Sequence, residues 1–425
     1  MSKITSLKAR QILDSRGTPT VEVDMSVDNG RVCRSSVPSG ASTGSHESVE
    51  LRDNDSTKFD GKSVFKAVEN INSIISSKTE SKSFEKLDDF DSFLIELDGT
   101  DNKSKIGANA ILGCSIAFMK CLSSNQNKEI YEFLNPSGPL ILPTPLMNII
   151  NGGAHANNGL DIQEFMIVPA GFETFSDSLR AGVETFVNLK KILQNNGYST
   201  AVGDEGGFAP NLESNEQALG FISEAIKKAG YKLGEEIFLA LDIAASEIYK
   251  DKIYKIDGNL FDSNQIINYY KKITEKYPII SIEDPLDEDD WSGWSDLTSS
   301  LGDKIQIVGD DLFVTNEKRL IEGINKSAAN SILVKINQIG TISETLRTIN
   351  LASENNYSYI ISHRSGETED TTISDLAVAT CSGQIKTGSC SRTDRTVKYN
   401  QLLRIEEFLG KDAKFAKLST FQPTT

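Results

Sequence analysis

Three short apolar runs in the second half of the chain each end at an acidic residue, and a fourth ends at a lysine. They are Ile237-Phe-Leu-Ala-Leu-Asp242, Ile279-Ile-Ser-Ile-Glu283, Ile305-Gln-Ile-Val-Gly-Asp310 and Ser331-Ile-Leu-Val-Lys335. Runs of this length, separated by helix-length stretches, are typical of buried parallel strands in β/α units. Because the carboxyl ends of such strands converge on one face of a barrel, we expect these four side chains to meet there. Three carboxylates in one place favour a hard divalent cation such as magnesium, with the lysine as a potential base.

The same four residues also have structural interpretations. An acid at a strand end can cap the helix that follows it, and Lys335 can form a salt bridge with one of the acids. If two cations lie beside Lys335, they lower its pKa, so that the amine is a neutral base at physiological pH. Such a base suits the removal of a proton from a carbon atom next to a metal-bound carboxylate.

Two glycine-rich segments could act on a ligand. Glu205 lies in Gly203-Asp-Glu-Gly-Gly-Phe208, between two predicted helices, and the glycines let the backbone approach a ligand. An ordinary acidic turn is the alternative for this segment. Ser39-Gly-Ala-Ser-Thr-Gly44 follows a predicted strand. It is either a connector or helix cap, or a lid that closes over the barrel and excludes water.

Basic and polar residues follow the last two predicted strands. Ser362-His-Arg-Ser365 and Gln384-Ile-Lys386 place Arg364, Ser365 and Lys386 on the expected functional face, where such side chains bind phosphate and carboxylate groups. Salt bridges to surface acids are the alternative. His155 and His363 also lie in loops, where a histidine is more often solvated than catalytic.

The composition restricts the class of protein. The 425 residues include 44 basic and 60 acidic side chains, and the net charge of −16 disfavours nucleic acid and anionic lipid as partners. Five cysteines without a Cys-x-x-Cys pair indicate reduced thiols and a reducing compartment. The N-terminus lacks the apolar core of a signal peptide, and no apolar stretch approaches the roughly 18–20 residues that span a bilayer. We therefore expect a cytoplasmic protein with no membrane span.

The elements that position these residues divide into two predicted domains, with a boundary near residue 138 in a proline-rich stretch. Residues 1–138 have the pattern of an α+β domain, a three-stranded meander followed by helices over 63–76, 83–97 and 107–123. Eight strand-like segments follow within residues 139–425: 146–150, 163–168, 237–242, 279–283, 305–310, 331–336, 358–362 and 384–387. This number and length are typical of a (β/α)8 barrel. Because no helix separates the first two strands and two helices then follow in succession, over 176–195 and 214–229, we expect an irregular barrel whose first strand pair is antiparallel.

Taken in order, these segments resemble the enolase family over nearly the whole chain. The similar stretches are Ser39-Gly-Ala-Ser-Thr-Gly44, Asn151-Gly-Gly-Ala-His155, Ile162-Gln-Glu-Phe-Met-Ile167, Gly203-Asp-Glu-Gly-Gly207, Leu241-Asp-Ile-Ala-Ala-Ser246, Ser281-Ile-Glu-Asp-Pro285, Val308-Gly-Asp-Asp-Leu312, Val334-Lys-Ile-Asn-Gln338, Ser362-His-Arg-Ser-Gly-Glu-Thr-Glu369 and Lys398-Tyr-Asn-Gln-Leu-Leu-Arg-Ile-Glu406. The stretch Ala154-His-Ala-Asn-Asn-Gly-Leu-Asp161 is similar to the bacterial type of the family.

The resemblance implies the reversible, magnesium-dependent dehydration of 2-phospho-D-glycerate to phosphoenolpyruvate. By the same resemblance, Lys335 removes the C2 proton and Glu205 protonates the departing C3 hydroxyl. One magnesium ion is implied at Asp242, Glu283 and Asp310, and a second is implied near Ser42. The residues implied to bind or surround the substrate are His155, Gln163, Glu164, Glu205, Lys335, His363, Arg364, Ser365 and Lys386. The family is usually dimeric or octameric, so a homo-oligomer is expected.

Two other functions are consistent with these residues. Another dehydratase of the wider superfamily, acting on an unphosphorylated acid sugar, would have similar metal ligands. It would not need the Ser39–Gly44 segment, Glu205 in its glycine turn, or the segment around His363. An enolase-like chain could also serve as a surface-binding or assembly component without catalysis, although both Lys335 and Glu205 are present.

Overall fold

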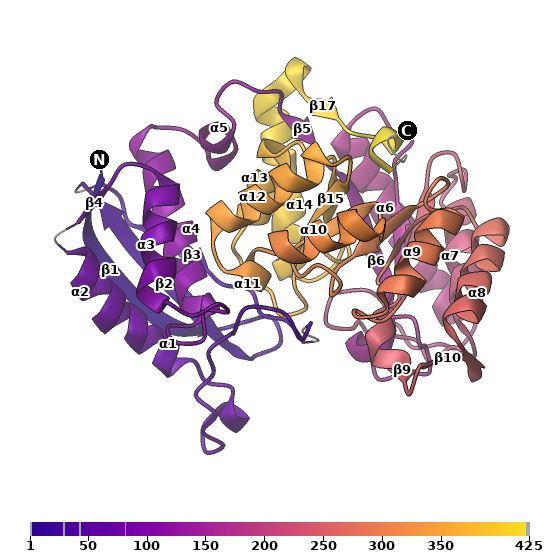
Figure 1. Cartoon of the computed structure of the whole chain (residues 1–425). Coiled ribbons are helices and arrows are strands. Elements are labelled where there is room, and N and C mark those ends of the chain that lie inside the picture. The colour runs from indigo at the N-terminus through magenta and orange to yellow at the C-terminus, as the bar shows by residue number, and fades with distance from the viewer. Residues whose placement is uncertain (1, 29, 42–43, 81, 422–425) are drawn as a thin grey trace.

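The N-terminal residues form a lobe that lies beside a closed barrel (Figure 1). The computed structural model describes residues 2–28, 30–41, 44–80 and 82–421. The predicted domain boundary near residue 138 falls between helix α5 (Ile130–Leu134) and the short strand β5 (Ile141–Leu142), and it stays a prediction.

The N-terminal sheet is the predicted meander with one extra strand. β1 (Ser2–Leu13), β2 (Pro19–Val27) and β3 (Cys33–Ser36) pair antiparallel, and β4 (Ser83–Phe84) joins the free edge of β1. Val21, Val23, Met25 and Val27 of β2 are buried on one face of the sheet, because successive side chains of a strand face opposite sides. Their face packs on α4 (Ala108–Asn125), which is buried along almost its whole length.

The predicted helix over 83–97 begins too early. Ser83 and Phe84 pair with the start of β1 instead, and α3 spans Leu87–Asp98. The ring centroid of Phe84 lies 5.0 Å from that of Phe90, so this strand residue packs on the same core as the helix and extends its apolar spacing. The helical pattern before it corresponds to three consecutive segments: α1 (Phe65–Glu69), the π-helical η2 (Asn70–Ile75) and α2 (Ser76–Thr79).

Eight strands close the barrel, as the sequence predicts. They are β6 (Thr144–Asn151), β7 (Glu164–Val168), β8 (Phe238–Asp242), β12 (Ile279–Glu283), β13 (Gln306–Gly309), β14 (Ser331–Val334), β15 (Ser358–Ser362) and β16 (Gln384–Lys386). β7 runs antiparallel to both of its neighbours, β6 and β8, whereas the other neighbouring pairs are parallel. The predicted antiparallel first pair is therefore confirmed.

Helices cover the outside of the barrel (Figure 1). They are α6 (Phe175–Asn195), α7 (Asn215–Lys228), α8 (Ser263–Lys276), α9 (Trp291–Leu301), α10 (Glu317–Lys326), α12 (Ile342–Glu354), α13 (Thr372–Ala379) and α14 (Thr393–Leu409). The short α11 (Ile336–Ile339) follows β14 and packs on α4 of the N-terminal lobe. A separate small sheet contains β9 (Tyr249–Lys250), β10 (Ile253–Ile256) and β11 (Asn259–Phe261), and β17 (Lys414–Phe415) pairs with β5. Leu146, Met166 and Leu333 belong to an apolar cluster distinct from the larger core.

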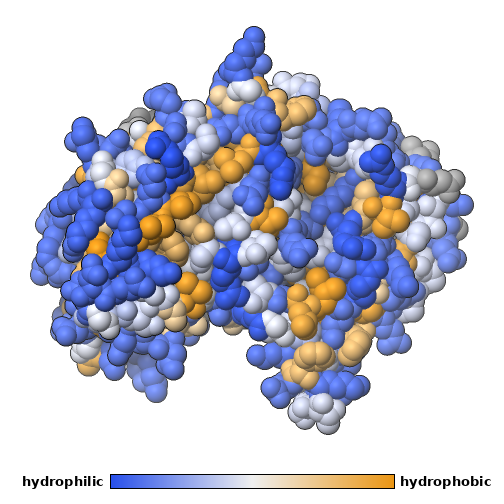
Figure 2. All heavy atoms as spheres, turned by 180° about the vertical axis from the view of Figure 1, so that it is seen from behind, coloured by the Kyte–Doolittle hydropathy of each residue, from blue (hydrophilic) through white to orange (hydrophobic). Residues whose placement is uncertain are grey.

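The outer surface is largely hydrophilic on the face that Figure 2 shows, with apolar side chains gathered in separate patches. Val183 and Val187 are exposed apolar residues on α6, and their spacing of four places them on one side of that helix. Within the described parts of the chain, no helix is both long and apolar enough to cross a membrane.

Candidate active site

The carboxyl ends of the barrel strands bring the predicted residues to one end of the barrel. Asp242 ends β8, Glu283 ends β12 and Lys386 ends β16. Asp310 and Lys335 directly follow β13 and β14. The first four are buried, and the Lys335 side chain is 14% exposed.

These strand ends surround a small pocket with an empty volume of ≈ 280 Å³. Its walls contain all nine residues that the sequence assigns to substrate binding, together with one predicted metal ligand and one strand-end serine: His155, Gln163, Glu164, Glu205, Lys335, His363, Arg364, Ser365, Lys386, Asp242 and Ser362. Glu283 and Asp310 lie beside it, in contact with Lys386 and Lys335.

The ammonium group of Lys386 is surrounded by carboxylates. Its Nζ atom lies 3.1 Å from Glu164, 3.0 Å from Asp242 and 2.9 Å from Glu283. Burial lowers the pKa of Lys386, but the charges of these acids outweigh it and raise the pKa well above its ordinary value. The space between the acids therefore favours a cation.

The site holds more buried acids than the two lysines balance: Glu164, Glu205, Asp242, Glu283 and Asp310. Burial and then the charge of Asp242 raise the pKa of Glu283 well above its ordinary value, as crowded negative charge should. A side-chain oxygen of Gln163 and one of Glu164 are buried without a hydrogen-bond partner among the described residues. Crowded carboxylates and unpaired oxygen atoms are the donors that magnesium prefers, so the residues present fit that ion.

The predicted metal ligands have other partners as well. Asp242 accepts a hydrogen bond from the backbone N–H of Ala244 at 3.0 Å, but the short helix that follows has no side-chain cap, so the capping interpretation does not hold for this residue. Asp310 accepts a hydrogen bond from the amide of Gln338 at 2.8 Å and pairs with Lys335. Ser42, assigned to a second ion, lies outside the described residues.

A neighbouring acid, Asp284, also lies within reach of this end of the barrel. Ligand oxygens of Asp284, Asp310 and Asp311 lie within 4.8 Å of one another. The Asp284 carboxylate accepts the backbone N–H groups of Asp310 and Asp311, each at 2.8 Å. Asp284 therefore holds the chain that follows β13 and positions Asp310.

The charge state of Lys335 depends on its partner. Burial lowers the pKa of Lys335, but the carboxylate of Asp310 outweighs burial and raises it above the ordinary value. The lowered pKa that we expect for Lys335 assumes two cations beside it. The protein groups alone raise this pKa instead. The short ion pair with Asp310 fixes the position of the amine at the pocket wall.

Glu205 reaches the pocket from its glycine turn. The turn needs glycine, because Gly206 has a φ of +86° and a Cβ atom there would lie 2.5 Å from the carbonyl oxygen of Ser391. Glu205 is buried and accepts a hydrogen bond from the side-chain amide of Asn148 at 3.0 Å. The turn is therefore more than a surface connection.

Glu205 and Glu164 form a coupled pair of buried carboxyls. Ligand atoms of both lie within 4.8 Å of one another and of His155. Burial, and next the charge of Glu205, raises the pKa of Glu164 well above its ordinary value. Burial raises the pKa of Glu205, but the two neighbouring imidazoles, Arg395 and Lys386 together outweigh burial and hold this pKa well below its ordinary value. The pair therefore tends to hold one proton and one negative charge.

Two histidines border this carboxyl pair. His155 Nδ1 lies 3.7 Å and His363 Nε2 lies 3.6 Å from oxygens of Glu205. Burial lowers the pKa of both imidazoles, which favours their neutral forms. These two ring nitrogens are buried without a hydrogen-bond partner among the described residues. Unpaired polar atoms that line a pocket are suited to a polar ligand.

The N-terminal lobe covers the pocket through Ser39 and Ala41 of the predicted lid and through Glu47, which follows it. The guanidinium of Arg364 donates to Glu47 at 2.9 and 3.1 Å. The hydroxyl of Ser365 accepts the backbone N–H of Ala41 at 2.7 Å. Ser39 and Gly366 exchange two backbone hydrogen bonds of 2.8 Å. Ala41 and Glu47 therefore contact Ser365 and Arg364, which the sequence assigns to anion binding.

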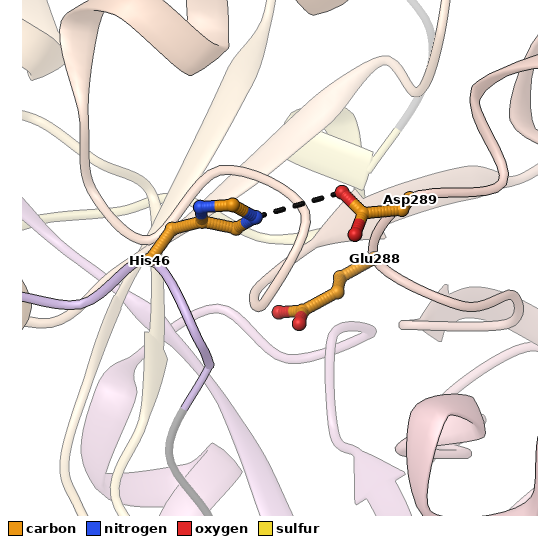
Figure 3. Close-up of side chains that lie close together, drawn as sticks. All are labelled: His46, Glu288 and Asp289. Carbon is orange, nitrogen blue, oxygen red and sulfur yellow. Dashed lines mark ion pairs between the residues drawn. The ribbon is translucent and has the colours of Figure 1, made fainter.

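A second contact joins this segment to the barrel farther out. His46 Nε2 lies 3.5 Å from a carboxylate oxygen of Asp289, with Glu288 beside them (Figure 3). Glu288 accepts hydrogen bonds from the backbone N–H and the hydroxyl of Ser45. These contacts hold the residues after the predicted lid against the chain that follows β12.

Sequence reasoning missed several residues that position the site. Asn148 could have been found, because it is a polar residue inside the apolar strand β6. Glu47 and Arg395 gave no such signal. Arg395 is fully buried in α14 and donates to the backbone oxygen of Ser365 at 2.6 Å. It therefore supports the loop that carries Arg364.

Comparison with family models covers both lobes. The N-terminal domain of enolase matches residues 4–134, and the C-terminal TIM barrel domain of enolase matches residues 139–424. Enolase-family domains are those of a lyase superfamily whose members generally bind magnesium. The match extends over both lobes and includes every element that builds the pocket. The chain belongs to the enolase family.

Proposed function

We propose that this protein catalyses the reversible dehydration of 2-phospho-D-glycerate to phosphoenolpyruvate. The proposal rests above all on one pocket, in which Lys335, the Glu164–Glu205 pair and Arg364 border the same space. A base, a protonated carboxyl pair and cations are the groups that removal of water from a phosphorylated hydroxy acid needs. Membership of the enolase family supports the same class of reaction.

Lys335 is the proposed base that removes the proton from C2. Asp310 holds its amine at the pocket wall, and the amine must be neutral to accept the proton. Glu205 is the proposed acid; because its own pKa is low and that of Glu164 is high, the proton that it delivers would be the one held on Glu164. That proton passes to the C3 hydroxyl, which leaves as water.

The anionic groups of the substrate need positive partners in a buried site. Arg364 offers a planar fork that matches a phosphate, and Lys386 and Ser365 lie on the same wall. Arg364 donates two hydrogen bonds to Glu47. A phosphate that binds Arg364 would therefore replace the Glu47 carboxylate as the partner of the guanidinium. His155, Gln163 and His363 complete the wall as polar neighbours.

Magnesium is the proposed cofactor. Asp242, Glu283 and Asp310 would hold one ion, and Ser42 is the proposed ligand of a second. When bound, magnesium would polarise the substrate carboxylate and stabilise the negative charge that develops as C2 loses its proton.

The test is the ultraviolet absorbance of phosphoenolpyruvate formed from 2-phosphoglycerate, with magnesium and with a chelator. We expect product with magnesium, and little with the chelator or with Lys335→Ala. Lys318→Ala, which replaces an exposed lysine on the same barrel, is the matched control and should keep full activity. Absence of product in the magnesium sample would reject the assignment in favour of another acid substrate or a non-catalytic role.

We also propose that the protein works in the cytoplasm as a homodimer or octamer. All five cysteines are free thiols in the structure, which suits a reducing compartment. Exposed apolar residues such as Val183 and Val187 supply surface for association. Light scattering coupled to size exclusion measures the mass in solution, and a monomer at micromolar concentration would contradict the oligomer.

A further inference from the structure

Two cysteines from different elements meet beside the N-terminal sheet. Cys33 begins β3, and Cys121 lies near the end of α4, which packs on β2 and β3. The sulfur of Cys121 lies 3.3 Å from the carbonyl oxygen of Met25, and Met25 is the residue directly opposite Cys33 in the β2–β3 ladder. The contact is therefore set by the packing of a helix on two paired strands.

The two thiols differ in exposure and in chemistry. Cys33 is partly exposed, whereas Cys121 is buried. The neighbouring Cys121 thiol lowers the pKa of Cys33 to about 7, and the nearby ammonium of Lys120 acts in the same direction. The pKa of Cys121 is raised, so this thiol keeps its proton. An accessible thiolate beside a protonated thiol is the arrangement of an attacking and a resolving cysteine.

Lys120 is held in place beside this pair. Its Nζ atom donates to the carbonyl oxygen of Arg34 at 3.0 Å and to Asp370 of the barrel at 2.7 Å. Because Arg34 follows Cys33 directly, the ammonium stays close to the thiolate. The backbone N–H of Ser36, at the end of the same strand, also donates to Asp370 at 3.1 Å. β3 and α4 therefore contact the barrel at one carboxylate.

We propose that Cys33 and Cys121 form a reversible disulfide when a hydroperoxide reaches Cys33. The Cys33 thiolate attacks one peroxide oxygen, the O–O bond breaks, and protonation of the leaving oxygen gives water and a Cys33 sulfenic acid. The sulfur of Cys121 then attacks the Cys33 sulfur, the S–O bond breaks, and a second water leaves with the Cys121 proton. Two thiols are oxidised and one hydrogen peroxide is reduced to two waters, and a dithiol reductant restores both thiols.

The test uses the full chain with hydrogen peroxide as the oxidant. The reduced protein is treated with peroxide, the remaining thiols are alkylated, and a non-reducing digest is mapped by mass spectrometry. We expect a linked peptide pair that contains Cys33 and Cys121, with loss of two hydrogens per chain, and its disappearance after dithiothreitol. Cys33 found as a sulfinic acid, or links that join other cysteines instead, would overturn the proposal.

Variants separate this pair from the other thiols. Cys33→Ser should abolish the link, whereas Cys381→Ser, which removes another partly exposed thiol, should leave it intact. Because Cys121 is buried, a variant at this position could also fail to fold. The role of Cys121 is therefore tested in the unchanged protein, by whether the linked peptide contains it. A link that persists in Cys33→Ser contradicts the assignment.

Reactivity gives an independent measurement. A thiol with a pKa near 7 reacts about fivefold faster at neutral pH than one near 9, once its lower nucleophilicity is included. Alkylation of Cys33 at pH 7 should therefore exceed that of Cys381 by about this factor or more, and Lys120→Gln should slow it. Equal rates for the two cysteines in the unchanged protein would contradict the attacking role of Cys33.

Discussion

Lys386 Nζ lies 2.9 Å from a carboxylate oxygen of Glu283, and both side chains are buried at the mouth of the barrel. The sequence places this lysine among the groups that bind substrate anions. In the structure it is the counter-ion of acids that we assign to magnesium and to proton transfer. The same ammonium therefore serves the folded protein as well as the proposed reaction.

Replacing Lys386 should destabilise the protein strongly. Lys386→Met leaves three buried carboxylates without their shared cation, and removal of one partner from a buried ion pair costs about 3–5 kcal/mol. Urea unfolding in the presence of a chelator measures the free energy of unfolding. Lys318→Met, at an exposed position, should change it by less than about 0.5 kcal/mol. An equal effect of the two variants would show that the carboxylates do not depend on Lys386.

Variants of the proposed base and acid should separate the two halves of the reaction. Lys335→Ala should abolish exchange of the C2 hydrogen with solvent and lower kcat by about a hundredfold to ten-thousandfold. Glu205→Gln should block dehydration to a similar extent while C2 exchange continues. Exchange of 2-phosphoglycerate in deuterated water, followed by NMR, distinguishes the two. Loss of exchange in both variants would contradict the separate roles.

The acids at the strand ends should control magnesium binding. Asp242→Asn keeps an oxygen that can accept the N–H of Ala244 but removes a charge, so we expect magnesium affinity to fall by about tenfold or more. Calorimetric titration of magnesium without substrate measures this directly. Asp296→Asn, an exposed change on α9, is the control and should bind as the unchanged protein does. Unchanged affinity in Asp242→Asn would remove this residue from the metal site.

A buried acid between the lobes should make stability depend on pH. Burial raises the pKa of Asp91 from 3.8 to about 6, while its carboxylate accepts the backbone N–H of Ser343. A raised folded-state pKa means that the stability contributed by the neutral form is complete below the unfolded pKa and is lost as pH rises through 6. About two pKa units correspond to about 3 kcal/mol in total, of which about 1 kcal/mol falls between pH 5 and 7.5.

Asp91→Asn fixes the neutral form and keeps an acceptor for Ser343. The unchanged protein should therefore lose about 1 kcal/mol relative to this variant between pH 5 and 7.5 in urea unfolding. Asp88→Asn, at an exposed position on the same helix, should show the same change in the free energy of unfolding between pH 5 and 7.5 as the unchanged protein. Parallel pH profiles for Asp91→Asn and the unchanged protein would show that Asp91 does not titrate in this range.

Much of the barrel could be predicted because its strands are apolar runs with acids or lysines at their ends. The spacing of these apolar runs along the sequence is enough to place Asp242, Glu283 and Lys335 at strand ends. The partners of these groups could not be predicted in the same way. The pairing of Glu47 with Arg364 depends on how the two lobes pack against each other. The sequence around Glu47 is polar and does not indicate which distant residue this carboxylate contacts. Phe84 shows the related limit for secondary structure, because its apolar side chain suits a helix or a strand equally well.

Because β7 runs antiparallel to both of its neighbours, the start of β7 lies at the same end of the barrel as the ends of the other strands. Glu164 begins β7, yet the ladder places it opposite Asp242, which ends β8. One part of the rim is thus supplied by the start of a strand, and the other parts by strand ends and by the loops that carry His155 and Glu205. A tandem duplication of a single strand–helix module, with every strand pointing the same way, could not reproduce this rim. Any ancestral or engineered shuffling of modules in this barrel must therefore preserve the inverted hairpin as a unit.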